Sequence, residues 1–414
     1  MATSFSNLRD LLTRLSQPIR ESLSKTSYKQ PDSDISIKSL LQSLLPPFPI
    51  NINEESDLQS QLTSFTLLCA ALASSQSSTY DQLSWIPLSL SNSADSAFRE
   101  LHKAFSDDQG KDITIELMPR VLPLLKTSIK ESSIDKEDAD GDEVSAASAR
   151  VPVAYAIVAA HQFKWLVTQV DSSQLGKLCS LIIPCALTAL DHWSPEVKGQ
   201  GMMTFIHLAK HVNSSVFSVY EDVILDACCQ NIASSDEIWE HVVEMSVLLV
   251  TCTQQNNPRS SWFEKVLNEM LSHLWRQPRS KERRIAFLKH IEPLFIGMGL
   301  VLLGHFRRMF PLFFKWMHAD DDQSVLLVLD SIKTVIKFTW IRLIDELVIL
   351  YKDASLKVEK EEIRARIVQI LTLLQKCKGE QFEAAWVKYK EDPNLSKLCT
   401  SLNPETVVSH PIST

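Results

Sequence analysis

Glycine is scarce in this chain, which has only 9 glycines among its 414 residues. That share is about 2%, against about 7% in an average protein. Phosphate-binding loops, nucleophile elbows and mobile lids need glycine, because most other residues rarely adopt their backbone angles. The scarcity therefore argues against enzymes built on such loops, and we expect a protein without catalytic activity.

Other signatures of function are also missing. The cysteines form no C-x-x-C pair and carry no catalytic signature, so we expect reduced thiols, mostly buried on apolar helix faces. The apolar run of residues 294–304 is about half of the ~20 residues that a membrane span needs. The net charge of -8 disfavours nucleic-acid binding, which normally uses a basic domain. We therefore predict no cofactor, no metal, no nucleic acid and no membrane as partners.

Helical periodicity dominates what the sequence does contain. Apolar side chains recur at steps of three and four in residues 175–190, and the pattern returns in residues 197–212. Between these runs Ser194 is suited to cap a helix, Pro195 to its first turn and Glu196 to its positive end. The pattern predicts a helical hairpin in which each helix has one apolar face.

Copies of this turn follow at nearly even intervals. Ser235, Ser280 and Asp322 precede new helical runs in residues 236–251, 281–295 and 323–340. Counted from Ser194, the successive intervals are 41, 45 and 42 residues. This spacing is typical of HEAT and armadillo repeats, whose period is roughly 40 to 47 residues. Two turns also have the sequence of a capping box, Ser234 with Glu237 and Asp320 with Gln323. We predict an all-α protein, an α-solenoid of HEAT/armadillo-like helical hairpins, with a non-repetitive helical bundle as the alternative.

The composition changes abruptly in residues 131–149, which hold seven acidic residues, one lysine and almost no large apolar side chain. Such a segment cannot bury enough surface to become ordered, so we predict a flexible acidic loop or linker. A regulatory phosphorylation or docking tract is the alternative. The predicted domains are an amino-terminal helical region (1–130), the acidic linker (131–150), the helical repeats (151–395) and a carboxy-terminal tail (396–414).

Further helices are predicted outside the hairpin series. They cover residues 7–23, 36–45, 57–72, 80–105 (two short helices interrupted at Pro87 and Ser91), 114–129, 151–170, 343–351, 358–377 and 381–389. The first is amphipathic and rich in serine and arginine, as a transit peptide would be. We interpret it as a structural helix, because Asp10 and Glu21 are acidic.

Two features resemble ligand-binding motifs but lack essential residues. His207 and His211 stand four residues apart, but Leu208 occupies the position of the glutamate in an H-E-x-x-H zinc protease. Residues 299–304 have the glycine spacing of a phosphate loop, but the lysine and hydroxyl residue that should follow are missing. We interpret the histidines as helix-surface residues and the glycine segment as apolar helix.

Two basic clusters are the strongest candidates for a binding surface. One lies around an inter-helix turn in residues 276–284, and the other is Arg307 with Arg308. They suit an acidic partner, an anion or a nuclear import receptor, with a solvated turn as the alternative. Tryptophans beside turns are candidate partner anchors, with core packing as the alternative. The candidate partner-binding residues are Arg279, Arg283, Arg284, Arg307, Arg308, Trp340 and Arg342.

Three segments carry a resemblance to a known family. They read A-L-D-H-W-S-P-E-V-K-G-Q-G-M-M-T-F-I-H-L (189–208), G-M-G-L-V-L-L-G-H-F-R-R-M-F-P-L-F-F-K-W-M (297–317) and L-V-L-D-S-I-K-T-V-I-K-F-T-W-I-R (327–342). Residues 175–377 resemble the Tti-two family, the smallest subunit of the TTT complex. The matched positions in the last two segments are Leu300, His305, Arg307, Arg308, Leu329, Thr339, Trp340 and Arg342.

This resemblance implies a non-catalytic HEAT-like subunit that binds a large Tti-one partner and, through it, a Tel-two subunit. In that family the complex works with the Hsp-ninety chaperone system to mature and stabilise phosphatidylinositol 3-kinase-related kinases. We therefore expect a cytoplasmic protein, with the nucleus as a further location. A nuclear transport or trafficking adaptor of the HEAT/armadillo type is the alternative, and a helical enzyme is the third hypothesis.

Overall fold

The computed structural model describes residues 2–28, 36–47, 55–77, 81–109, 112–132, 152–353 and 360–402. Every regular element within these ranges is a helix, which confirms the predicted all-α class. The chain divides into two compact units. Unit 1 comprises residues 1–255 and 264–290, and unit 2 comprises residues 256–263 and 291–414.

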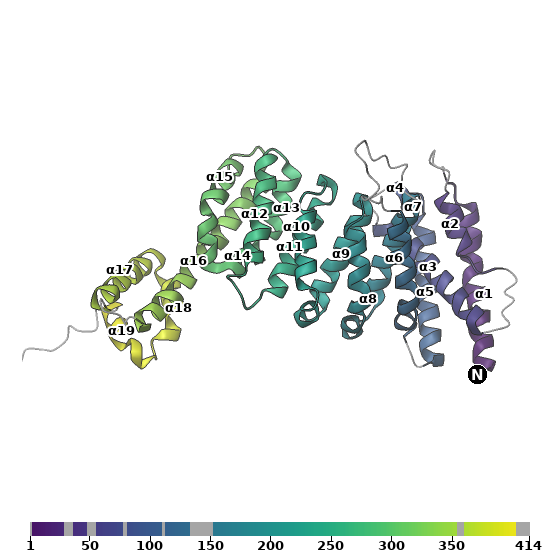
Figure 1. Ribbon diagram of the computed structural model, residues 1–414, viewed down its shortest axis with the longest axis horizontal. Coiled ribbons are helices and arrows are strands. Elements are labelled where there is room, and N and C mark those ends of the chain that lie inside the picture. Colours follow the sequence, from purple (N-terminus) through teal and green to yellow (C-terminus); the bar gives the residue numbers. More distant parts are fainter. Residues whose placement is uncertain are drawn as a thin grey trace, which may run out of the picture. The chain divides into compact units, whose positions relative to one another are not determined.

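Unit 1 contains the helices from α1 to α11, most of α12, and α13 (Figure 1). Their bounds are α1 Ala2–Lys25, α2 Ile37–Ser43, α3 Glu55–Ser74, η1 Ser75–Ser77, α4 Asp81–Ser84, α5 Leu88–Gln109, α6 Ile113–Glu131, α7 Val153–Gln169, α8 Ser172–Leu190, α9 Pro195–His211, η4 Ser214–Phe217, α10 Glu221–Asn231, η5 Asp236–Ile238, α11 Trp239–Thr253, α12 Ser261–Arg276 and α13 Lys281–His290.

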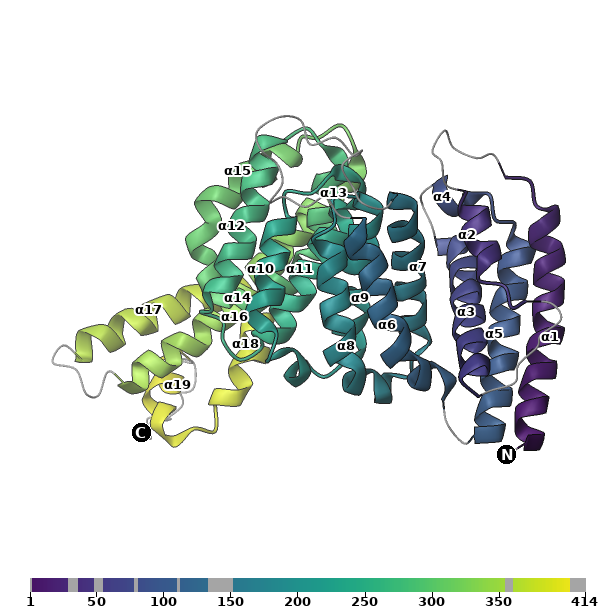
Figure 2. The same cartoon turned by 45° about the vertical axis from the view of Figure 1, so that its right-hand side comes forward.

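Successive hairpins of unit 1 pack in two layers. In one layer α8 contacts α6 and α10. In the other layer α7 contacts α9, α9 contacts α11, and α11 contacts α13. The second layer continues to α3, which packs against α7. Figure 2 shows these helices following one another along the unit. The stack confirms the predicted α-solenoid, in which each helix buries its apolar face against its neighbours.

The predicted turns lie where the second helix of each hairpin begins, but the capping differs from the prediction. Ser194 is the N-cap of α9, yet its side chain makes no capping hydrogen bond. The capping box of Ser234 and Glu237 is wrong, because the Ser234 hydroxyl donates instead to Asn231 at 3.5 Å. Ser280 does cap α13, since its hydroxyl accepts a backbone N–H bond at 3.3 Å.

Helix α8 of unit 1 is both long and apolar. Among the described residues, α8 is the one single helix that could cross a membrane by length and composition. Residues 281–290 and 292–316 are separated by a bend and reach the required length and apolar composition only if they are counted together as one span. However, Leu175, Ile182, Ile183, Cys185 and Ala186 are all fully buried. This is the burial expected of a core helix, because α8 packs between α6, α9 and α10.

The predicted helices of the amino-terminal region are confirmed, with one exception in residues 80–105. There α4 and α5 are separate helices, but α5 runs through Ser91, where a break was predicted. The Ser91 side chain is buried and donates to the carbonyl of Ala73 at 3.3 Å, so its hydroxyl is satisfied inside a continuous helix.

Unit 2 contains a second set of helices after α13. Their bounds are α14 Glu292–Met298, η6 Gly299–His305, α15 Phe306–Trp316, α16 Asp322–Asp353, α17 Lys360–Lys378, α18 Glu380–Trp386, η8 Val387–Tyr389, η9 Pro393–Leu395 and α19 Ser396–Leu402. Helix α16 contacts α14, η6, α15 and α17, and α17 contacts α18 and α19. Aromatic residues fill the core around the last helices, where Phe382 stacks on Trp386 at 5.6 Å between ring centres.

Two predictions in unit 2 are wrong. Residues 323–340 and 343–351 belong to one continuous helix, α16, because no glycine or proline interrupts it. Its cap is Asp321 rather than Asp320, since the Asp321 carboxylate accepts the N–H of Ser324 at 2.8 Å. The glycine segment is helical as predicted, in the form of a 3-10 helix over residues 299–305 that starts at Gly299 with a positive φ of 53°.

The domain boundaries predicted from composition stay predictions. Residues 133–151, which make up most of the predicted acidic linker, lie outside the described residues. The helices on either side of them, α6 and α7, pack against each other within unit 1. At the start of the predicted tail, residues 396–402 form α19, where Leu398 and Leu402 are buried.

Candidate protein-binding surfaces

Arg283 of α13 is a predicted partner-binding residue that the structure buries. Its guanidinium forms an ion pair with Asp236 and donates to the carbonyl of Ser234 at 2.9 Å. It also lies over the ring of Trp239, at 5.1 Å from the ring centre. Arg283 therefore joins α13 to the turn between α10 and α11, and this use of its charge is internal to unit 1.

The other predicted arginines are distributed over both units. Arg279 is exposed beside the same turn, whereas Arg284 is buried. Arg307 and Arg308 are exposed near the start of α15 in unit 2. The side chain of Arg342 lies outside the described part of the chain. Within unit 1, exposed Arg279 is thus the remaining predicted residue with a surface position.

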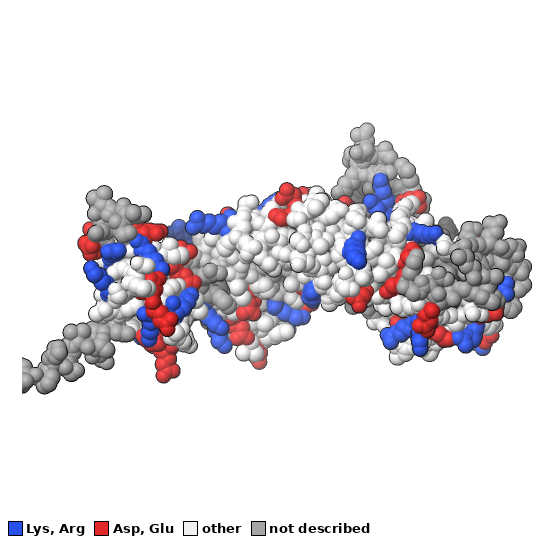
Figure 3. Space-filling view, turned by 90° about the horizontal axis from the view of Figure 1, so that it is seen from below, with Lys and Arg blue, Asp and Glu red and all other residues white. Residues whose placement is uncertain are grey.

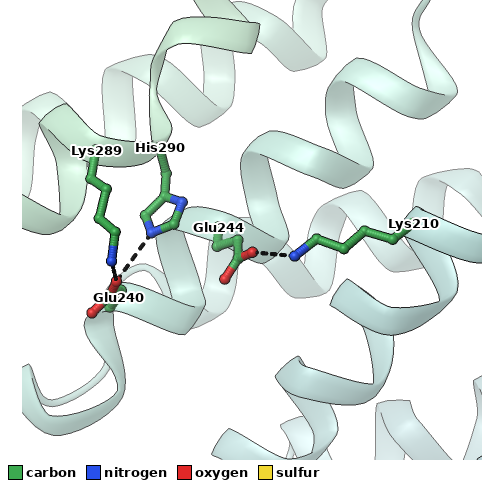
Figure 4. A network of polar contacts seen from close by, with 5 residues as sticks. All are labelled: Lys210, Glu240, Glu244, Lys289 and His290. Atoms are coloured by element: carbon green, nitrogen blue, oxygen red, sulfur yellow. Dashed lines mark hydrogen bonds and ion pairs between the residues drawn. The ribbon is translucent and has the colours of Figure 1, made fainter. Parts of the chain in front are cut away.

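Polar contacts connect neighbouring helices of the second layer in unit 1 (Figure 4). Lys210 of α9 pairs with Glu244 of α11 at 2.7 Å. Glu240, also on α11, pairs with Lys289 at 2.5 Å and with His290 at 3.2 Å, both on α13. The hydrogen bond from Lys289 holds the pKa of Glu240 below its ordinary value. These charges neutralise one another, so this stretch of α9, α11 and α13 is not a basic surface.

The turn between α8 and α9 is anchored to the end of α6. His192 is fully buried, and its Nδ1 accepts the backbone N–H of Ser194 at 3.0 Å. Its Nε2 lies 3.2 Å from the hydroxyl of Ser132, and the indole N–H of Trp193 donates to the Ser132 carbonyl at 3.2 Å. These contacts fix the residues immediately before α9 against the end of α6.

The side chains considered for catalysis or metal binding have the properties of packed residues. His207 and His211 pack edge to face at 4.4 Å, and burial lowers the pKa of His207 to about 4. Among the described residues, no group of three or more His, Cys, Asp or Glu side chains is placed to hold a metal. Burial raises the pKa of Cys185 and Cys228 to about 12, so both thiols are protonated and weakly nucleophilic at neutral pH.

Unit 2 has an open groove of about 970 Å³ between α16 and α18. Trp340, the predicted anchor, lies in its wall and is only 8% exposed. The lining residues are Leu329, Ile332, Lys333, Ile336, Lys337, Trp340 and Ile341 of α16, Lys378 at the end of α17, Gln381, Ala384 and Ala385 of α18, and Val387 and Lys388 of η8. We refer to this surface as the α16–α18 groove.

The charged residues that line the α16–α18 groove are all lysines. Lys378 lies over Trp340, with its Nζ 5.6 Å from the ring centre. Lys388 donates to Asp345 at 2.7 Å, and this bond raises the pKa of Lys388. Lys333 and Lys337 are exposed one helical turn apart on α16. The groove thus combines apolar walls with a positive rim.

This single sign of charge is local to the groove. On the face shown in Figure 3, Lys and Arg side chains lie beside Asp and Glu side chains over α17 to α19. Arg366 pairs with Glu362 at 2.6 Å and Lys390 with Glu383 at 3.0 Å in this region. A general excess of positive charge on unit 2 therefore does not account for the lysine rim.

Stacked hairpins that bury their apolar faces against one another define a helical-repeat protein. The sequence matches the Tti2 family over residues 68–319, which is more than half of the chain. The chain belongs to the Tti2 family. The predicted resemblance to the family is confirmed, although the match begins well before residue 175 and ends at residue 319. The segment 327–342, which holds four of the predicted matched positions, lies outside the match, so those positions stay predictions.

Two kinds of relatives accompany the family match. An uncharacterized protein of Arabidopsis thaliana is 54% identical, over 96% of this chain and 95% of that protein. TELO2-interacting protein 2 of Mus musculus is 22% identical over 60% of this chain and 52% of its own length. The chain thus matches about half the length of the mouse relative.

Two solved structures with a similar arrangement of helices are distant from this chain in sequence. A designed armadillo repeat protein has 14% identity and a TM-score of 0.40, covering 72% of this chain and 98% of that protein. A chain from the crystal structure of Kap121p bound to Nup53p has 13% identity and a TM-score of 0.37, covering 96% of this chain and 42% of that one.

Sequence reasoning missed the lysine rim and the anchoring of the α8–α9 turn. A signal for the rim was available, since Leu329, Lys333, Ile336, Lys337 and Trp340 follow a helical spacing on α16. The facing wall on α18 belongs to a different helix about fifty residues away, so periodicity alone does not reveal a groove. The contacts of His192 and Trp193 with α6 are equally long-range.

Proposed function

We propose that this chain is the Tti2-type scaffold subunit of a TTT-like cochaperone complex. The observation that carries the proposal is the match to the Tti2 family over residues 68–319. The mouse relative is named for its interaction with TELO2. By analogy, this chain binds a large Tti-one-like helical-repeat subunit and a Tel-two-like subunit, and with the Hsp-ninety system it supports phosphatidylinositol 3-kinase-related kinases.

The proposed mechanism is presentation of a preformed surface. Helical-repeat stacks bind proteins through long surfaces whose shape depends on contacts between neighbouring repeats. In unit 1 these contacts include the ion pairs between α9, α11 and α13, and the Arg283 contact with the α10–α11 turn. Such contacts hold adjacent hairpins in register, so the partner-binding surface needs little ordering when the complex forms.

Affinity purification from the native cell tests this proposal. The chain is tagged at its carboxy terminus, recovered at gentle salt, and its co-purifying proteins are identified by mass spectrometry. We expect one large helical-repeat protein and a Tel-two-like protein in comparable amounts, together with chaperone components. Recovery of importins, transport cargo or coat proteins instead would support the transport-adaptor alternative, and recovery of the chain alone would contradict both.

Depletion of the chain gives a second readout. If it supports kinase maturation, the protein levels of the phosphatidylinositol 3-kinase-related kinases fall over hours while their transcripts stay constant. An unrelated Hsp-ninety-dependent kinase is the control and keeps its level. Subcellular fractionation of the tagged chain tests the proposed cytoplasmic location, with the nucleus as a further site. Unchanged kinase levels after complete depletion would contradict the proposed role.

A further inference from the structure

The α16–α18 groove has the apolar character of a helix-binding site. Leu329 and Ile336 of α16 are 45% and 47% exposed, and Val387 beyond α18 is 59% exposed. Leu329, Ile332, Ile336 and Trp340 recur at helical spacing, so they form one stripe along the wall of the groove. Exposed apolar groups in a concave surface are typical of sites that receive the apolar face of another helix.

The rim restricts which helix fits. Lys333, Lys337, Lys378 and Lys388 line the groove, and no Asp or Glu is among the lining residues. The positive charge of Lys388 is partly compensated by its ion pair with Asp345. The ammonium group of Lys378 lies over the ring of Trp340. Long lysine side chains can cover apolar surface with their carbon chains while their ammonium groups meet a carboxylate at the edge. The rim therefore favours an acidic occupant and disfavours a basic one.

We propose that the α16–α18 groove binds an amphipathic helix of a partner protein whose apolar stripe is flanked by Asp and Glu residues. Apolar side chains one and two turns apart on that helix would contact Leu329, Ile336 and Trp340. The flanking carboxylates would pair with Lys333 and Lys337 on one side and with Lys378 on the other. The proposal rests on the scaffold function above and specifies the chemistry of one partner segment.

A helical-peptide display library tests the groove directly. The probe is a pool of 16-residue helices with randomised surface positions, selected against the full-length chain. Peptides whose binding requires the groove are identified by counter-selection against the full-length Ile336→Asp variant. We expect the groove-dependent peptides to share apolar residues at spacings of three and four, with Asp or Glu beside them. Absence of groove-dependent peptides, or selected peptides without acidic enrichment, would overturn the proposal.

The best selected peptide is then measured by fluorescence anisotropy against matched variants. Ile336→Asp and the double variant Lys333→Glu with Lys337→Glu should each weaken binding at least tenfold, which corresponds to about 1.4 kcal/mol. Leu326→Asp is the apolar control, because Leu326 is 63% exposed on α16 but does not line the groove. Lys376→Glu with Lys397→Glu is the charge control, since both lysines are exposed outside the groove. Equal losses in test and control variants would contradict a specific site.

Two further measurements separate other occupants and other functions. Light scattering across a concentration series detects self-association, and a dimer lost in Ile336→Asp would show that a second copy fills the groove, against the proposal.

Affinity purification of the Ile336→Asp variant from cells shows which partner proteins of the complex it still binds. If the native partners stay bound while peptide binding is lost, another protein uses the groove and the scaffold function stands. If the wild-type chain recovers no complex but binds acidic helices, the scaffold function fails while the groove assignment holds.

Discussion

Individual residues connect the hairpins of unit 1 through contacts that local sequence does not indicate. Arg283 belongs to a basic cluster, and by composition alone it resembles a surface residue. Its ion-pair partner Asp236 lies 47 residues earlier in the chain, so only the packing of α13 on the preceding hairpin brings them together. The same cluster leaves Arg279 exposed. Arg283 is buried and Arg279 is exposed because of how the hairpins pack, and the local sequence does not show this difference.

Replacing Arg283 tests its structural role. Arg283→Ala should lower the free energy of unfolding by about 1.5 to 3 kcal/mol, because hydrogen bonds to a charged group and the contact with Trp239 are lost. Arg279→Ala, a matched change at an exposed position, should change it by less than about 0.5 kcal/mol. Urea unfolding monitored by circular dichroism measures both. Similar small effects would show that the Arg283 guanidinium is dispensable to the stack.

A buried histidine makes the stability of unit 1 depend on pH. Burial lowers the pKa of His192 to about 4, from an ordinary value near 6.5. Between these values the unfolded chain binds a proton at this position that the folded chain does not bind, so stability falls as the pH drops from about 6.5 to about 4. The contribution is fully present above pH 6.5 and decreases at most by about 1.4 kcal/mol per pH unit.

The variant His192→Asn isolates this contribution. Asparagine does not titrate, and its carbonyl oxygen can accept the Ser194 N–H bond that His192 Nδ1 accepts. The variant should therefore lose less stability between pH 7 and pH 5 than the wild type, even if it is less stable at pH 7. Denaturant midpoints at several pH values measure the slope. Parallel slopes in the two proteins would exclude His192 as the titrating group.

Helices and their turns were the most predictable level of this structure. Apolar spacing of three and four residues depends only on neighbours in sequence, and it located α6 to α9, α11 and the turns at residues 194, 235 and 280, whereas α10 was not predicted. Capping was less predictable, because Ser194 is at the N-cap position of α9 but its side chain makes no capping hydrogen bond. The break predicted between residues 340 and 343 was also wrong, because α16 continues through these residues without interruption.

Close packing within a hairpin explains one of the few glycines. A Cβ atom added at Gly201 of α9 would lie 2.9 Å from the Cβ of Ala189 and 3.1 Å from the carbonyl oxygen of Ala186, both on α8. Contacts this short force the helices apart. At Gly176 of α8 the nearest atom would be a Val216 methyl at 3.7 Å, an ordinary distance. The glycine at position 201 thus allows α8 and α9 to approach closely.

Alanine at these two positions should therefore act in opposite directions. Gly201→Ala should lower the free energy of unfolding by about 1 to 2 kcal/mol, because overpacking exceeds the gain in helix propensity. Gly176→Ala should raise it by about 0.5 to 1 kcal/mol, since only the propensity gain applies. Thermal and urea unfolding compare the two variants with the wild type. Stabilisation by Gly201→Ala would indicate that α8 and α9 adjust without loss.

At the scale of the whole molecule, the class of fold was predictable and the binding surface was not. The spacing of the turns indicated a stack of hairpins, and the apolar periodicity of each helix can be read from its own segment of the sequence. The α16–α18 groove depends on α18 returning beside α16, and no short-range pattern specifies that return. Trp340 illustrates the difference, because the sequence marked it as a candidate anchor but not as part of a lysine-rimmed wall.

The division into two units predicts two responses to core mutations. Phe205 of unit 1 and Phe382 of unit 2 are both completely buried. Phe205→Ala and Phe382→Ala should each destabilise the mutated unit by about 3 to 5 kcal/mol, through lost burial and the cavity that remains. Hydrogen exchange read by mass spectrometry assigns the loss of protection to peptides of one unit or the other. We expect Phe382→Ala to accelerate exchange in α16 to α19 and leave α7 to α11 protected, with the reverse pattern for Phe205→Ala. Equal acceleration of both units by either change would show that they unfold together, and a groove variant would then have to be checked for effects on unit 1 as well.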